Sequence, residues 1–177
     1  GVCIRDRSIA CKPVVFNESL PERVGVIIEV PGFIAARTAM ENLEYLAGLD
    51  GGWDPRETLR LMGLFDLYEH RDEKVKSYSL GMRQKLAIVQ ALMEHQRLVL
   101  LDEPTNGLDR ASVTAFLEEI GRQREDGTTV IIFSHHNDEI RQFFDHIYTI
   151  VIGRLYAVYF VSPAVVLACC PAFESAD

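Results

Sequence analysis

Leu98-Val-Leu-Leu-Asp102-Glu103-Pro104-Thr-Asn-Gly-Leu-Asp109 is the stretch that decides the fold of this chain. Its leading apolar residues are bounded by turn residues, a pattern typical of a buried strand in a parallel sheet. Two adjacent carboxylates, Asp102 and Glu103, follow directly, and Pro104 ends the strand. Because α/β sheets bind ligands at the carboxyl ends of their strands, the pair predicts a metal and phosphate site. The alternative is a buried strand with a merely solvated acidic end.

The size and charge of the chain limit the classes of protein to which it can belong. Its 177 residues are enough for one domain with a sizeable core. A net charge of -8 argues against a protein that coats nucleic acid, since such binding needs clustered Lys and Arg, so we expect no nucleic-acid partner. The cysteines lack C-x-x-C spacing, which favours a reducing compartment over a metal site: they are Cys3, Cys11, Cys169 and Cys170.

Strand and helix patterns alternate along the second half of the chain, which predicts βαβ units and an α/β fold with a mostly parallel sheet. Core strands are expected over residues 24–28, 98–101 and 128–133, and a closing hairpin over residues 147–160. Helices are expected after the N-cap residues Thr38, Asp54, Ser79 and Asp109, and again over residues 136–144. Residues 33–97 lack strong strand signals and indicate a helical insertion.

Three further segments carry side chains suited to phosphate or metal binding. In Tyr78-Ser79-Leu-Gly81-Met82, an N-cap serine beside a glycine leaves backbone N–H groups free at a helix start, where anions bind. Phe133-Ser134-His135-His136 follows the second core strand, and Val26-Ile-Ile-Glu29-Val-Pro31 follows the first. Their plainer interpretations are a simple helix cap, a histidine pair at a strand-helix junction and a solvated loop acid.

In their order along the chain these segments resemble the ABC-type (ATP-binding cassette) ATPases over about residues 21–155. The run from Leu98 resembles the Walker B segment and the D-loop, and the Ser79 segment resembles the signature motif in a Tyr-Ser-Leu-Gly-Met form rather than the commoner Leu-Ser-Gly-Gly-Gln. His135 matches the H-loop histidine, and Glu29 stands where the Q-loop usually has glutamine. The resemblance implies a P-loop NTPase-like sheet with an inserted helical subdomain.

The resemblance also implies a role for each matching residue in ATP hydrolysis, which consists mostly of positioning and charge neutralisation. Asp102 would hold Mg²⁺, with Glu29 beside it. Glu103 would orient or deprotonate the attacking water, and His135 would contact the γ-phosphate. The remaining matches concern a dimer, in which two residues would bind the partner's nucleotide and one would couple the two sites: Ser79 and Gly81, and Asp109.

The phosphate-binding P-loop of this family, G-x-x-x-x-G-K-[ST], has no match in the sequence. Since it precedes the Q-loop in the family, we expect it before Gly1, so that residues 1–155 form a partial, N-terminally truncated ABC ATPase domain whose helical subdomain spans about 33–97. Hydrogen bonds to charged groups contribute about 1.5–3 kcal/mol each, and each 1.4 kcal/mol changes affinity about tenfold. We therefore expect this chain alone neither to bind ATP tightly nor to hydrolyse it.

The C-terminal residues 156–177 depart from the family and are interpreted as an atypical tail. No charged residue occurs from Leu155 to Phe173. A membrane-spanning helix needs about 20 apolar residues, but Pro163 and Pro171 interrupt this stretch. A strand followed by an unrelated, poorly ordered tail is the preferred interpretation.

The function implied by the resemblance is that of an ATP-binding subunit of an ABC transporter, similar to drug or bacteriocin export systems. Its expected cofactors are ATP and Mg²⁺, and its expected partners are a membrane permease and a second ATPase subunit. It would lie in the cytoplasm on the inner face of the cell membrane. The alternatives are a non-catalytic partner that supplies Ser79 and Gly81 to a complete cassette, and a soluble ABC ATPase unconnected with transport.

Overall fold

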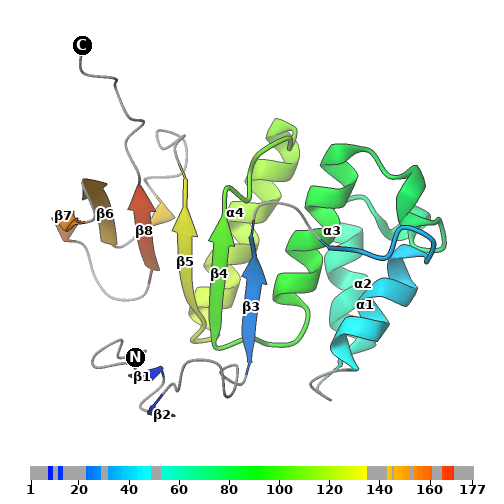
Figure 1. The fold of residues 1–177 in the computed structure, drawn as a ribbon, viewed down its shortest axis with the longest axis horizontal. Coiled ribbons are helices and arrows are strands. Elements are labelled where there is room, and N and C mark those ends of the chain that lie inside the picture. Colours follow the sequence, from blue (N-terminus) through cyan, green and yellow to red (C-terminus); the bar gives the residue numbers. More distant parts are fainter. Residues whose placement is uncertain are drawn as a thin grey trace.

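The computed structural model describes residues 8–9, 12–13, 23–28, 32–48, 53–134, 143–144, 146–151, 154–160 and 165–169 (Figure 1). The strands are β1 Ser8–Ile9, β2 Lys12–Pro13, β3 Val24–Ile27, β4 Leu98–Asp102, β5 Thr129–Phe133, β6 His146–Val151, β7 Arg154–Phe160 and β8 Val165–Cys169. The α-helices are α1 Ala39–Ala47, α2 Pro55–Leu64, α3 Leu80–Leu92 and α4 Arg110–Glu125, and the short 3₁₀ helices are η1 Tyr68–His70 and η2 Val75–Ser77.

One six-stranded sheet organises the fold, with the strand order β3-β4-β5-β8-β6-β7. All neighbours in it run parallel except β6 and β7, which form an antiparallel hairpin. Val26, Leu100 and Ile131 lie side by side across the first three strands. β1 and β2 form a separate two-stranded pair. The predicted α/β fold with a mostly parallel sheet is confirmed.

The N-caps predicted from the sequence are confirmed. Each of them is formed by hydrogen bonds between residues close together in the sequence. Thr38 and Glu41 form a reciprocal capping box at α1, in which the Glu41 N–H donates to Thr38 Oγ1 at 3.1 Å. Asp54 caps α2 ahead of Pro55, and Ser79 and Asp109 cap α3 and α4 in the same way.

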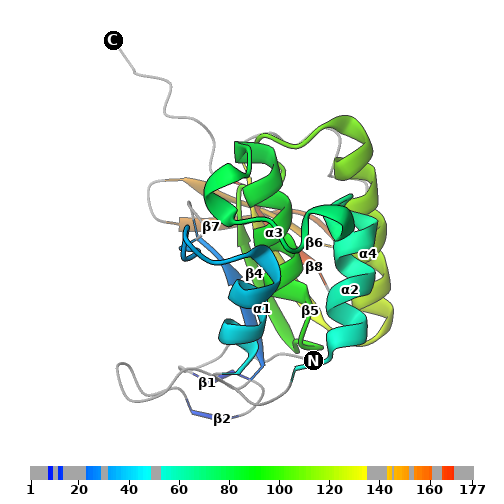
Figure 2. The same ribbon diagram turned by 90° about the vertical axis from the view of Figure 1, so that its right-hand side faces the viewer.

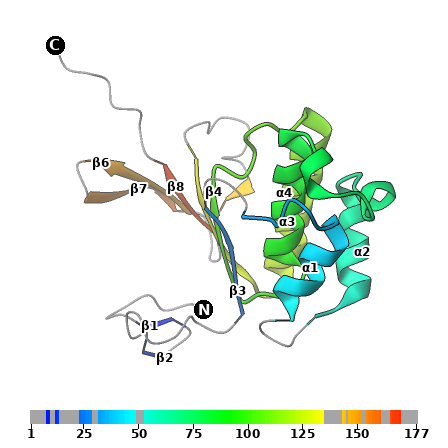
Figure 3. The same ribbon diagram turned by 45° about the vertical axis from the view of Figure 1, so that its right-hand side comes forward.

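All four α-helices lie on one face of the sheet (Figure 3). The order β3-β4-β5 places each new strand on the same side of the last, and right-handed crossovers then put both sets of connecting helices on the same face. Residues facing the helices are buried, as with Val99 and Leu101 of β4. The alternate residues are only partly covered, and on this face Ile28 is 69% exposed.

The helices between β3 and β4 form a layer of their own, in which α3 packs against both α1 and α2 (Figure 2). Buried Asn42 ties the loop before α1 to this layer, because its side chain accepts from the Ile34 N–H at 2.8 Å and donates to the Ile34 carbonyl at 3.1 Å. Within the described part of residues 33–97, no segment joins the six-stranded sheet. The described part of these residues contains α1, α2, η1, η2 and α3, joined by turns and loops.

The C-terminal region differs from the sequence-based expectation. Residues 165–169 form β8 and pair in parallel with β5 on one side and β6 on the other. The last strand in the sequence therefore lies inside the sheet, where a poorly ordered tail was expected. None of the helices in the described part of the chain combines the length and apolar character that crossing a membrane requires.

Candidate metal and phosphate site

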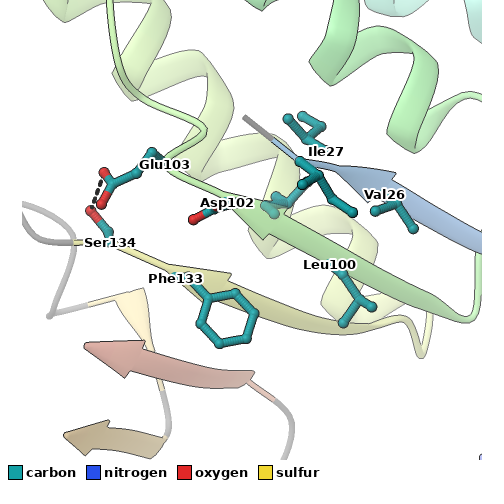
Figure 4. Close-up of a pocket in the computed structure, with 9 residues that line it drawn as sticks. Val26, Ile27, Leu100, Asp102, Glu103, Phe133 and Ser134 are labelled. Atoms are coloured by element: carbon teal, nitrogen blue, oxygen red, sulfur yellow. Dashed lines mark hydrogen bonds between the residues drawn. The ribbon is translucent and has the colours of Figure 1, made fainter. Parts of the chain in front are cut away.

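A pocket of about 360 Å³ lies at the carboxyl ends of β3, β4 and β5 (Figure 4). Three polar residues line it, Asp102, Glu103 and Ser134. The rest of its lining is apolar and comes from the ends of the same three strands: Val26, Ile27, Ile28, Leu100, Leu101 and Phe133. The structure thus places the two predicted carboxylates where a parallel sheet is expected to bind ligands.

Glu103 is held at its backbone and at its side chain by β5 and the residue after it. Its N–H donates to the Phe133 carbonyl at 2.9 Å, which extends the β4–β5 ladder by one residue. The Ser134 hydroxyl, which is buried, donates to Glu103 Oε2 at 3.3 Å (Figure 4). Glu103 also has a φ of 44°, in the left-handed region that costs energy for a residue with a side chain. Such strain is typical of functional positions.

The carboxylate of Asp102 is chemically suited to be a ligand of Mg²⁺. It is the last residue of β4 and lines the pocket beside Glu103. Mg²⁺ prefers oxygen ligands and is usually held by one or two carboxylates, with substrate phosphates and water completing its shell. Among the described residues, no group of three or more His, Cys, Asp or Glu side chains gathers around a common point. Asp102 and Glu103 are the described carboxylates of the pocket that could contribute oxygen ligands to such an ion.

The charge of the pocket does not suit phosphate on its own. No lysine or arginine occurs among the described residues that line it, and its titratable groups are the two acids. A nucleoside triphosphate needs positive charge or several N–H donors to offset the negative charge of its phosphates. The site as described supplies oxygen ligands for a metal but not a cradle for phosphate.

Ser79 and Gly81 lie at the start of α3 and are absent from the pocket lining. Ser79 Oγ accepts from the Met82 N–H at 3.1 Å, which is the hydrogen bond of an ordinary N-cap. Gly81 is needed for a close approach of two backbones, because a Cβ added there would lie 2.9 Å from the Gly107 carbonyl oxygen. The absence of a side chain at Gly81 thus already has a packing reason.

Asp109 lies at the start of α4, also away from the pocket. Its carboxylate accepts from the Ser112 N–H at 2.9 Å and from the Ser112 hydroxyl at 2.8 Å, and Lys85 Nζ lies 3.2 Å away. The hydrogen bond from the Ser112 backbone lowers the pKa of Asp109 well below its usual range, and the Ser112 hydroxyl and the Lys85 ammonium add to this effect.

A comparison with known protein families identifies the family of this chain. The profile of the ABC transporter family matches residues 8–106, more than half of the chain, including both pocket carboxylates and the α3 start. The chain belongs to the ABC transporter family.

Two curated relatives of this ABC transporter family chain are bacitracin transport ATP-binding proteins. The protein from Enterococcus faecalis is 39% identical over 140 residues, which cover 77% of this chain and 45% of the relative. The protein from Bacillus licheniformis is 41% identical over 144 residues, which cover 78% and 46%. The chain thus spans less than half the length of these two relatives.

A solved structure described as the ATP binding subunit of an ABC transporter has the same fold. It superimposes with a TM-score of 0.69 at 27% sequence identity, covering 76% of this chain and 57% of that chain. The match supports the predicted relation of the parallel sheet and its helices to the ABC ATPase fold.

Seven site residues were predicted from the resemblance to ABC ATPases, and the structure describes five of them. It brings Asp102 and Glu103 together in one pocket and places Ser79, Gly81 and Asp109 outside its lining. The two others, Glu29 and His135, lie outside the described residues.

Two polar residues in the site region were not assigned a role from the sequence. Ser134 belongs to the H-loop-like segment, and the register pairs Asp102 with Phe133 and so places Ser134 beside Glu103. Gln84 of α3 was missed altogether, yet its side chain donates to the Pro104 carbonyl at 3.0 Å. Knowledge of the strand pairing would have found Ser134, whereas no local pattern marks Gln84.

The low pKa of Asp109 makes the stability of this ABC chain depend on pH. Asn at position 109 still accepts from the Ser112 N–H but has no charge for Lys85. Because a lowered pKa stabilises the fold above the unfolded pKa, near 4, and this contribution is lost as the pH falls through the folded pKa, wild type loses its advantage in acid. We expect Asp109→Asn to lower the thermal midpoint by about 1–2 degrees at pH 7, as for the loss of an exposed ion pair, with a difference that shrinks below about pH 4.

Thermal unfolding of both proteins between pH 7 and pH 2 checks this expectation. Asp66→Asn is the matched control, since Asp66 is exposed and its positive φ of 58° suits asparagine equally well. A difference between wild type and Asp109→Asn that stays constant over this pH range would show that the charge of Asp109 contributes nothing.

Proposed function

We propose that this chain carries the metal-binding, water-positioning and signature elements of an ATP-binding subunit of an ABC transporter. The observation that carries the proposal is the pair Asp102 and Glu103 at the carboxyl end of β4, with the Glu103 carboxylate hydrogen-bonded to Ser134. Adjacent acids in this position suit a hydrolysis in which one oxygen ligand holds a cation and the other orients water.

The proposed roles in the reaction are those that the resemblance to ABC ATPases implies. Mg²⁺, when bound with ATP, would neutralise charge on the phosphates, and Asp102 is the residue that would hold it. Glu103 would accept a proton from the attacking water or orient it, and the Ser134 hydroxyl donates to one of its two carboxylate oxygens. Glu29 as a second metal neighbour and His135 as the γ-phosphate contact complete the proposed site.

The start of α3 serves a second nucleotide in this proposal. Ser79 and Gly81 lie on an N-terminal helix turn outside the pocket, so they are suited to a phosphate held by another subunit rather than to one held beside Glu103. Asp109, the N-cap residue of α4, forms an ion pair with Lys85 of α3 and would couple the two nucleotide sites. The proposed assembly is a dimer of ATPase subunits bound to a membrane permease at the cytoplasmic face of the membrane.

The names of two relatives support a role in transport. Both are named for bacitracin transport, and the sequence of the signature segment resembles that of drug or bacteriocin export systems. We propose a drug-like transported compound on this basis.

A second function has one observation in its favour. The pocket has no basic residue among its described lining residues, which suits a chain that supplies Ser79 and Gly81 to a complete cassette without hydrolysing ATP itself. Such a partner would stimulate ATP turnover by an intact relative without binding Mg-ATP at its own pocket.

A chimaera tests the catalytic assignment. The part of the E. faecalis relative that precedes the matched region would be joined to this chain. That part is expected to supply the phosphate-binding segment. We expect Mg²⁺-dependent ATP hydrolysis by the chimaera, and a fall of at least about 100-fold in kcat for Glu103→Gln, because the carboxylate acts on the water rather than on ATP binding. Labelled-ATP binding and phosphate release measure the two effects separately.

Glu118→Gln is the control, because Glu118 is an exposed acid of α4 away from the pocket. The assignment fails if the chimaera binds Mg-ATP and hydrolyses it equally well with and without Glu103. The unmodified chain is expected to show no micromolar binding of Mg-ATP, and tight binding would mean that its pocket holds phosphate in a way the described residues do not explain.

A further inference from the structure

The first turns of α3 and the turn after β4 are joined by a buried side chain. Gln84 is 7% exposed, and its Nε2 donates to the Pro104 carbonyl at 3.0 Å, with the Glu103 carbonyl 3.5 Å away. The Glu103 carbonyl also accepts from the Asn106 N–H at 3.1 Å, which closes the turn. One amide group of α3 therefore anchors the backbone that carries the candidate catalytic acid.

Two more contacts join the same pair of elements. Gly81 lies so close to the Gly107 carbonyl that a Cβ would approach its oxygen to 2.9 Å, and Lys85 forms an ion pair with Asp109 at 3.2 Å. These contacts, together with that of Gln84, extend over the whole turn from Glu103 to Asp109. The close backbone approach leaves α3 little freedom to shift relative to this turn.

The geometry gives this contact a mechanical consequence. Ser79 caps α3, and Gln84 follows five residues later on the same rigid helix, about 7 Å along its axis. A displacement of the helix start must therefore reach Gln84 and, through it, the Glu103–Pro104 peptide. Glu103 already has a positive φ, so its conformation depends on the contacts that hold the turn.

We propose that Gln84 is a positioning residue that makes the α3 start and the Glu103 turn move as one body. This inference rests on the proposed function, in which Ser79 serves one nucleotide of a dimer and Glu103 another. Gln84 then couples the two nucleotide sites within a single chain, since a phosphate that draws in the start of α3 also shifts the acid of the other site.

Hydrogen exchange tests the anchor in the chain itself. Gln84→Met keeps the length of the side chain but removes the donor, so we expect exchange of the Asn106 N–H to accelerate about tenfold, the effect of losing one buried hydrogen bond. Exchange in β4 and the thermal midpoint should change no more than in Gln90→Met, a half-buried glutamine of the same helix. Equal exchange rates at Asn106 in the two variants would overturn the proposal.

Turnover of the chimaera tests the coupling, because both nucleotide sites of its dimer are expected to be complete. ATP hydrolysis would be compared between the chimaera and its Gln84→Met and Gln90→Met variants. We expect Gln84→Met to reduce kcat about tenfold with an unchanged KM for ATP, and Gln90→Met to retain the full kcat. A merely structural role would lower the thermal midpoint and affect both kinetic constants.

The two experiments fail in different ways. If the chimaera does not hydrolyse ATP, the proposed function is contradicted, while the exchange of Asn106 still decides whether Gln84 anchors the turn. If the chimaera is active and its Gln84→Met variant is equally active, the coupling is wrong and the proposed function stands.

Discussion

Gly25→Ala is expected to lower the free energy of unfolding by about 3 kcal/mol or more, which would leave little stable protein. Gly25 lies in the middle of β3, where α3 crosses the strand, and a Cβ there would lie 1.9 Å from the Ala91 carbonyl oxygen. That oxygen is backbone in a buried helix, so no side-chain rotation relieves the clash. Either α3 moves away from the sheet or β3 leaves it.

Urea unfolding of wild type and variant measures the loss, and another glycine provides an opposite control. Gly121 lies inside α4, where an added Cβ would meet nothing within 4 Å apart from the nearby backbone of its own helix. Gly121→Ala should therefore stabilise the chain by about 0.5–1 kcal/mol through its better helix propensity. If Gly25→Ala unfolds at the same urea concentration as wild type, β3 and α3 are not packed as described.

The features that the sequence predicted well are those with local causes. The cap of α1 rests on Thr38 and Glu41, three residues apart, so the capping-box spacing was enough to locate the helix start. The strand that begins at Leu98 could be predicted because turn residues bound its short apolar run. Such features depend on residues close together in the sequence, so the sequence alone is enough to predict them.

The features that the sequence did not predict depend on residues far apart in the chain. Nothing in the sequence distinguishes Gly25 from another glycine in a strand. Its importance becomes visible only when the backbone of Ala91 is known to lie against it. Gln84 bonds to a residue 20 positions away. The uncharged segment that forms β8 fits an edge strand, a central strand or a tail equally well, and only its pairing with β5 and β6 decides among them.

The candidate site divides in the same way. Adjacent acids after an apolar run were enough to predict the position of Asp102 and Glu103, since the end of a parallel strand fixes where they lie. Their support by Ser134 requires the β4–β5 register, which no property of either strand alone specifies. The roles of Glu29 and His135 remain predictions, because both residues lie outside the described part of the chain.

The double variant Arg60→Met/Arg122→Met is expected to cost about 3 kcal/mol of stability, near the lower end for breaking a buried ion pair because both arginines are partly exposed. The two guanidinium groups, one on α2 and one on α4, share the carboxylates of Glu57 and Glu119. The Glu119 side chain is only 2% exposed. Without either cation, two nearly buried carboxylates would face each other across the helix contact.

Non-additivity is the signature of this shared arrangement. Arg60→Met alone leaves Arg122 on both carboxylates, and Arg122→Met alone leaves Arg60, so each single change should cost only about 1 kcal/mol. The double variant should then exceed the sum of the two by about 1 kcal/mol, the interaction energy of residues in one network. Urea unfolding of the four proteins completes the cycle, with Arg56→Met as an exposed α2 control.

Acidification should partly rescue the double variant. In wild type the hydrogen bond from Arg60 lowers the pKa of Glu57, so this carboxylate stabilises the fold above its unfolded pKa, near 4, and loses that effect as the pH falls through its folded pKa. In the double variant that stabilisation is absent at pH 7, and protonation removes the unpaired charge. The difference in stability from wild type should therefore narrow between pH 7 and pH 4, whereas an equal difference at both pH values would mean that the arginines stabilise the α2–α4 contact by packing alone.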